Sequence, residues 1–89
     1  MIRVTLHAKM ELKKLLSNKI NMTGVSLRII DTGQGKLGLA LDIEAPADYV
    51  IEYEGCKILV VEPELVDQKI ITLDIEHTSH GAEFVLSEE

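Results

Sequence analysis

A chain of 89 residues with a net charge of −6 carries a single cysteine, Cys56. This length predicts one domain, residues 1–89, and the lone cysteine excludes an internal disulfide and a cysteine-only metal site within one chain. With no Trp, one Phe, two Tyr and no apolar run near the ~20 residues that span a bilayer, the acidic chain suits neither nucleic acids nor membranes. We therefore expect a cytoplasmic protein.

The first predicted elements are a short strand and a helix. Ile2, Val4 and Leu6 alternate with polar residues, which predicts a strand. From His7 the period becomes helical, and His7 itself is expected to cap the helix rather than bind a ligand. The apolar stripe consists of Ala8, Leu12, Leu15, Leu16 and Ile20.

Four lysines lie outside that stripe, at positions 9, 13, 14 and 19. They predict an amphipathic helix whose apolar side covers a sheet and whose cationic side is solvated. The alternative is that the cationic side docks an acidic partner. Asn21-Met22-Thr23-Gly24 is typical of a helix exit, with Gly24 in a left-handed cap.

Residues 33–38, Gly33-Gln34-Gly35-Lys36-Leu37-Gly38, match the G-x-G-x-x-G pattern of dinucleotide-binding loops. In those loops a helix follows the last glycine and directs its N–H groups at a phosphate. Here residues 25–31 and 39–44 on either side alternate with period two, which predicts a β-hairpin. Anion binding by the loop N–H groups and Lys36, which needs no helix, is the alternative.

The rest of the chain predicts further strands. Residues 49–53 and 56–61 form a second hairpin around Glu54-Gly55, and residues 63–67 can form one helical turn that starts at Pro63. Residues 69–76 and 82–86 are the last strands, joined by residues 77–81. The pattern predicts an α+β fold, a small and mostly antiparallel β-sheet assembly with one N-terminal amphipathic helix.

Few residues suggest chemistry. Cys56 is in phase with Ile58 and Val60, so we expect it on an apolar face and inert. His77 and His80 could chelate zinc or iron with nearby carboxylates, within one chain or across a subunit interface. We otherwise expect no cofactor. No residue set supports catalysis, since Ser79 lies in no nucleophile motif and the carboxylates are scattered, so an enzyme is not expected.

Several strings, in this order and spacing, resemble the HesB-like family, the IscA-like A-type carriers of iron–sulfur cluster biogenesis. The family strings are L-R-L, G-G-C-S-G-L-A, G-V-K-V-V-V-D-P, L-D-Y and G-F-x-F. They correspond here to the strings that begin at Leu27, Gln34, Gly55, Leu73 and Gly81. The resemblance covers nearly the whole chain and implies a HesB-like domain that self-associates.

The ligands of that family are missing from this sequence. The family holds iron or a cluster with one cysteine in the glycine loop and two in a C-G-C near the C-terminus. Lys36 stands at the loop position, the sequence ends at residues 87–89 before any C-G-C, and Cys56 matches an apolar strand residue. Clusters need thiolates, and a lysine ammonium has no lone pair. The resemblance thus implies a degenerate metal site and an interaction or regulatory module, with protein partners in iron–sulfur or sulfur metabolism.

Overall fold

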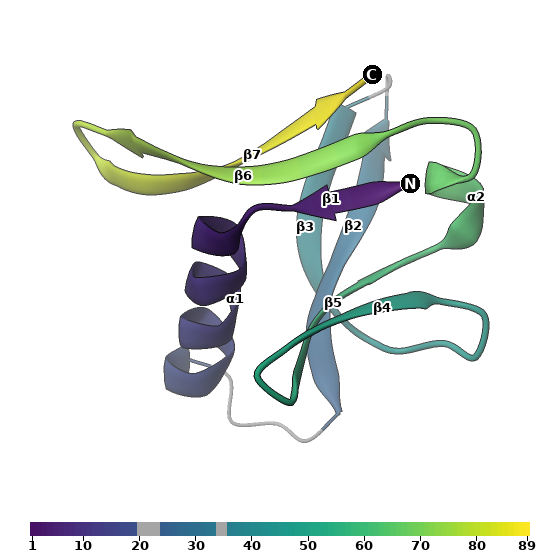
Figure 1. Ribbon diagram of the computed structural model, residues 1–89, viewed down its shortest axis with the longest axis horizontal. Coiled ribbons are helices and arrows are strands. Elements are labelled where there is room, and N and C mark those ends of the chain that lie inside the picture. Colours follow the sequence, from purple (N-terminus) through teal and green to yellow (C-terminus); the bar gives the residue numbers. More distant parts are fainter. Residues whose placement is uncertain (20–23, 34–35) are drawn as a thin grey trace.

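A three-stranded sheet joins the two ends of the chain. The computed structural model describes residues 1–19, 24–33 and 36–89, and within them β1 (Ile2–Val4) pairs in parallel with β6 (Ile71–Thr78), which pairs antiparallel with β7 (Gly81–Glu88). Figure 1 shows β6 and β7 running across the direction of β2 and β3.

The second sheet has four strands in the order β3-β2-β5-β4: β3 (Lys36–Ile43), β2 (Val25–Gly33), β5 (Cys56–Val61) and β4 (Tyr49–Tyr53). The predicted α+β class is confirmed, but both sheets are mixed rather than purely antiparallel. The parallel pairs are β1 with β6 and β2 with β5. Each joins strands that are distant in sequence, whereas the antiparallel pairs are hairpins.

Helix α1 (Leu6–Lys19) begins one residue earlier than expected. The Thr5 hydroxyl accepts a hydrogen bond from the Ala8 N–H at 3.2 Å, so Thr5 caps the helix and the prediction for His7 is wrong. A hydroxyl at the N-cap reaches the third helical N–H, as Thr5 does here. The strand therefore ends at Val4, and Leu6 is 60% exposed instead of lying on an apolar strand face.

The core forms where α1 packs on β4, β5 and β6. The predicted stripe is buried at Ala8, Leu12 and Leu16, while Ile20 lies outside the described residues. The remaining members of this cluster come from β2, β5, α2 (Pro63–Val66) and β6: Leu27, Ile29, Ile58, Leu59, Val61, Val66, Ile71 and Leu73. None of the described helices is long and apolar enough to cross a bilayer.

The second predicted hairpin forms, and a bulge changes the phase of its second strand. Glu54 and Gly55 both have positive φ, 50° and 78°, as a tight hairpin turn requires. A bulge where β4 meets β5 then inserts an extra residue, so that Ile58 and Leu59 both reach the core cluster while Val60 lies outside it. Cys56 is therefore not in phase with Val60, although it does pack against the core as predicted.

The last hairpin is longer than predicted. Strand β6 starts at Ile71 and continues to Thr78, and β7 starts at Gly81, so the connection contains only Ser79 and His80. His77 consequently lies within a strand rather than in a loop. At the other boundaries, Gly24 has the expected positive φ of 84°, whereas Asn21, Met22 and Thr23 lie outside the described residues.

Candidate functional site

The glycine pattern lies at one end of the four-stranded sheet, called here the hairpin end. Strands β2 and β3 pair antiparallel from Val25 opposite Ile43 to Gly33 opposite Lys36. A strand therefore follows Gly38, as predicted, and the helix that a dinucleotide loop needs is absent from this position. The loop closes a hairpin.

Local hydrogen bonds hold the described part of this tip. The Asp31 carboxylate accepts from the Gly33 N–H at 2.8 Å, and the Thr32 hydroxyl donates to the Lys36 carbonyl at 3.1 Å. Gln34 and Gly35 lie outside the described residues. An anion site at the tip would need the Gly33 N–H that Asp31 already engages, and it would meet a negative charge there. The described geometry thus gives the anion alternative no support.

Gly38 is needed at the hairpin end for a steric reason. A Cβ placed on Gly38 would lie 2.9 Å from the Thr32 Cγ2 atom, closer than carbon atoms normally approach. Thr32 comes this near because the register shifts between Asp31 and Gly33, where β2 carries one extra residue. The last glycine of the pattern therefore serves strand packing.

At the other end of the sheet, called here the crossing end, charged side chains are buried. Residues 44–48 connect β3 to β4, which are the two outer strands, so this short segment must cross β2 and β5. Arg28 on β2 donates two hydrogen bonds to the Asp48 carboxylate, at 2.9 and 2.5 Å, and one to Asp42 at 2.8 Å. It also donates to the Ile43 carbonyl at 3.2 Å. We call Arg28, Asp42 and Asp48 the crossing cluster.

The crossing cluster is ionised, and each of its three side chains is hydrogen-bonded to another member. The hydrogen bond from Arg28 holds the pKa of Asp48 below its ordinary value, while the Ile43 N–H and then Arg28 lower the pKa of Asp42. The same contacts, led by the Asp48 hydrogen bond, raise the pKa of Arg28. Because Arg28 on β2 bonds both Asp42 and Asp48, the cluster fixes the crossing segment to the sheet.

Sequence reasoning missed this cluster. Period-two alternation over residues 25–31 places Ser26 and Arg28 on the polar face of their strand, whereas the two residues are only 4% and 7% exposed. The available signal was an arginine inside an otherwise apolar strand, followed by two aspartates in the next segment. Nothing local indicates that the segment containing Asp48 returns across that strand.

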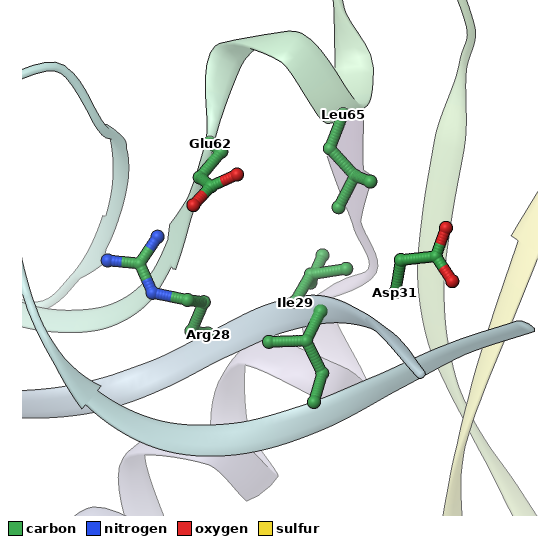
Figure 2. Close-up of a pocket in the computed structure, with 6 residues that line it drawn as sticks. Arg28, Ile29, Asp31, Glu62 and Leu65 are labelled. Carbon is green, nitrogen blue, oxygen red and sulfur yellow. The ribbon is translucent and has the colours of Figure 1, made fainter. Parts of the chain in front are cut away.

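A cleft of about 280 Å³ lies next to the crossing cluster. Its lining residues are Arg28, Ile29, Ile30, Asp31, Glu62 and Leu65. Figure 2 shows Glu62 beside Arg28 on one side of the cleft and Asp31 on the other, with Leu65 and Ile29 between them. The lining contains no histidine, cysteine or hydroxyl nucleophile, so the cleft offers no catalytic group beyond its two carboxylates.

The remaining predicted candidates lie apart. Cys56 is half-buried at the start of β5, and the next residue, Lys57, accepts a hydrogen bond from the Ser26 hydroxyl at 3.1 Å. Cys56 is therefore at the crossing end. His77 and His80 are exposed at the tip of the β6–β7 hairpin, together with Ser79. Among the described residues, no three His, Cys, Asp or Glu side chains gather closely enough to hold a metal ion.

No protein-family model matches the chain, and no curated protein matches it by sequence. Several solved structures resemble it, among them IscA and SufA. IscA, solved with a [2Fe-2S] cluster, is 16% identical with a TM-score of 0.64, over 98% of this chain and 84% of that one. Escherichia coli SufA, involved in the biosynthesis of iron–sulfur clusters, is 22% identical with a TM-score of 0.65, over 97% and 78%. The chain has the fold of IscA and SufA.

The expected HesB-like fold is thereby confirmed, and the chemistry must be judged from the side chains. Lys36, at the position where the resemblance implies a loop cysteine, is exposed, and it forms no ion pair with any residue that the structure describes. The sole thiol, Cys56, lies near the opposite end of the nine-residue strand β2. At the usual rise per strand residue, the two positions are about 25 Å apart.

Proposed function

We propose that this chain is a non-enzymatic scaffold with the IscA and SufA fold that acts in iron–sulfur protein biogenesis through contacts with other proteins. One chain does not hold a cysteine-ligated cluster. The observation that carries this proposal is the placement of Lys36 at the hairpin end and of Cys56, the only thiol, at the crossing end.

The ligand chemistry supports the second part of the proposal. A [2Fe-2S] cluster is usually held by four thiolates, and a protonated lysine offers no lone pair to iron. Cys56 packs against the hydrophobic core and is separated from the hairpin end by the length of β2. Each chain supplies only one thiol, so a cluster held by protein thiolates would need Cys56 from several chains.

The scaffold role is supported by what the fold retains. The fold resembles those of IscA and SufA over nearly the whole chain, and the buried Arg28 and Asp48 are hydrogen-bonded to each other. Within the described residues, no buried side-chain polar atom lacks a partner. What the chain presents to other molecules is its surface, including the lysines on the outer side of α1, of which Lys13 bonds Glu54 at 2.7 Å.

Anaerobic reconstitution tests the ligand claim. The wild type, Cys56→Ser and E. coli SufA are treated with ferrous iron and sulfide and then desalted. We expect SufA to acquire visible absorption and bound iron, and both forms of this chain to remain colourless. A stoichiometric cluster on the wild type would overturn the claim. If that cluster were lost in Cys56→Ser, its ligands would include Cys56 from several chains.

Genetic complementation tests the pathway. Cells that lack this chain should show reduced activity of iron–sulfur enzymes, and Cys56→Ser should restore that activity as well as the wild type, because the scaffold needs no thiolate. Unchanged iron–sulfur enzyme activity in the deletion strain would overturn the assignment of this chain to iron–sulfur protein biogenesis. Rescue by the wild type alone would show that the thiol is required.

A further inference from the structure

Strand β3 leaves one edge of the four-stranded sheet open. It pairs with β2 on one side, and no described strand pairs with it on the other (Figure 1). Alternate N–H and C=O groups along such an edge have no partner in the sheet, so they can accept another strand. This edge is a candidate interaction surface.

The apolar face of β3 extends beyond the part that the core covers. Leu37 and Leu39 are half-buried against the core, whereas Leu41 and Ile43, on the same face, are 57% and 65% exposed. Helix α1 packs on β4, β5 and β6. The exposed leucine and isoleucine therefore continue an apolar strip along an open edge, a combination that soluble proteins normally avoid.

The other three edge strands are protected. Strand β1 has three residues, β4 has five and meets a bulge, and β7 carries Glu83 and Glu88 without any basic residue. Strand β3 has eight residues, pairs regularly with β2 from Leu37 to Ile43, and has charges only at Lys36 and Asp42. A proline, bulge or central charge that would block a further strand is absent from it.

We propose that a second copy of this chain pairs its β3 antiparallel with this edge, with Leu39 opposite the partner's Leu39. This inference goes beyond the proposed scaffold function. The strand sequence Lys-Leu-Gly-Leu-Ala-Leu-Asp is self-complementary about Leu39. Leu37 then faces the partner's Leu41, and Lys36 faces the partner's Asp42. Two-fold symmetry repeats both pairs.

Other registers fit less well. A slip of one residue would set the three leucines opposite Gly38, Ala40 and an end charge of the partner strand instead of opposite its leucines. A slip of two residues would set Asp42 opposite the partner's Gly38, and Lys36 opposite the partner's Glu44. Glu44 already bonds Lys57 at 2.9 Å within its own chain. Asp42 is available, because its side chain is 53% exposed and a carboxylate accepts more than the two bonds that Arg28 and the Ile43 N–H provide.

Sedimentation equilibrium from low micromolar to near-millimolar protein tests the pairing. We expect the wild type to dimerise reversibly and weakly, since two strands bury a small area. Leu41→Lys should weaken the dimer at least ~tenfold by placing a charge in the apolar strip. Leu6→Lys is the matched control, because it changes a similarly exposed leucine on α1 and should dimerise like the wild type. A monomeric wild type, or equal dimerisation of the Leu41 variant, would overturn the proposal.

The register has its own test. In Lys36→Asp, the new aspartate faces the partner's Asp42 at both symmetry-related positions, so the dimer should weaken. Lys36→Arg keeps the positive charge and should preserve the dimer. Amide hydrogen exchange should slow in residues 36–42 as the wild-type concentration rises, and it should not slow in Leu41→Lys. Undiminished dimerisation of Lys36→Asp, or exchange in β3 that is independent of concentration, would reject this strand pairing.

Discussion

The two ends of the four-stranded sheet use charged residues in opposite ways. At the crossing end, Arg28 is buried and bonded to two aspartates and a carbonyl. At the hairpin end, Lys36 is exposed, and the described part of the tip is held by main-chain contacts to Asp31 and Thr32. Both cations belong to the same strand pair. The difference shows that the buried charge is structural, whereas the exposed one leaves the surface open for contacts.

The largest expected effect is at Arg28. Arg28→Met leaves the buried Asp48 without its charged partner, and we expect it to lower the free energy of unfolding by about 3–5 kcal/mol, measured by urea denaturation of dilute protein. Arg28→Met/Asp48→Asn should recover part of this loss, because the amide is uncharged and its oxygen can still accept from the Ala45 N–H.

Arg3→Met is the control for that comparison. Arg3 is exposed on β1 and forms no ion pair among the residues that the structure describes, so its replacement should change the unfolding free energy by less than ~0.5 kcal/mol. An equal effect of Arg28→Met and Arg3→Met would mean that the crossing cluster does not stabilise the fold.

The second largest effect is expected from low pH, which should lower the contribution of the crossing cluster to the free energy of unfolding. The pKa of Asp48 is lowered in the folded chain, chiefly by Arg28, so its contribution to stability is complete above the ordinary carboxyl pKa of about 4 and is lost as the pH falls through the lowered value. Urea unfolding should therefore show stability decreasing with acidity below about pH 4. Asp48→Asn should be less stable at neutral pH and decline less steeply. Identical slopes for the two proteins would contradict this assignment.

Sequence reasoning anticipated the hairpin end better than the crossing end, because hairpins are local. Period-two alternation around Gly33 and around Gly55 was sufficient to predict two antiparallel pairs, and family strings predicted the fold. The parallel pairing of β2 with β5 has no local signal. The burial of Arg28 depends on the same long-range arrangement, since Asp48 reaches it only after the chain has crossed the sheet.

Two local features were nevertheless predicted wrongly. Thr5 is a better helix cap than His7 because its short side chain holds an oxygen at the distance of the Ala8 N–H, and the alternation of Ile2, Val4 and Leu6 obscured that boundary. The bulge opposite Ile51 reverses the side-chain alternation in β5, and no residue type in that segment predicts a bulge.

A moderate effect is expected at the hairpin end from Gly38→Ala. The new methyl group would meet Thr32 Cγ2 at 2.9 Å, and because Thr32 is exposed it can rotate at a cost of about 0.5–1.5 kcal/mol. Thr32→Ser removes that methyl group and keeps the hydroxyl that bonds the Lys36 carbonyl. The double variant should therefore be as stable as Thr32→Ser alone. A persistent loss in the double variant would place the strain elsewhere.

The smallest expected effect is at Lys36. Its side chain is exposed and forms no ion pair with the described residues, so Lys36→Ala should change the unfolding free energy of dilute protein by less than ~0.5 kcal/mol. Repeating the urea titration at high concentration should reveal a loss, because only the dimer sets Lys36 opposite an aspartate. A large loss in dilute protein would mean that Lys36 stabilises the monomer, and the contrast between the two ends of the sheet would then fail.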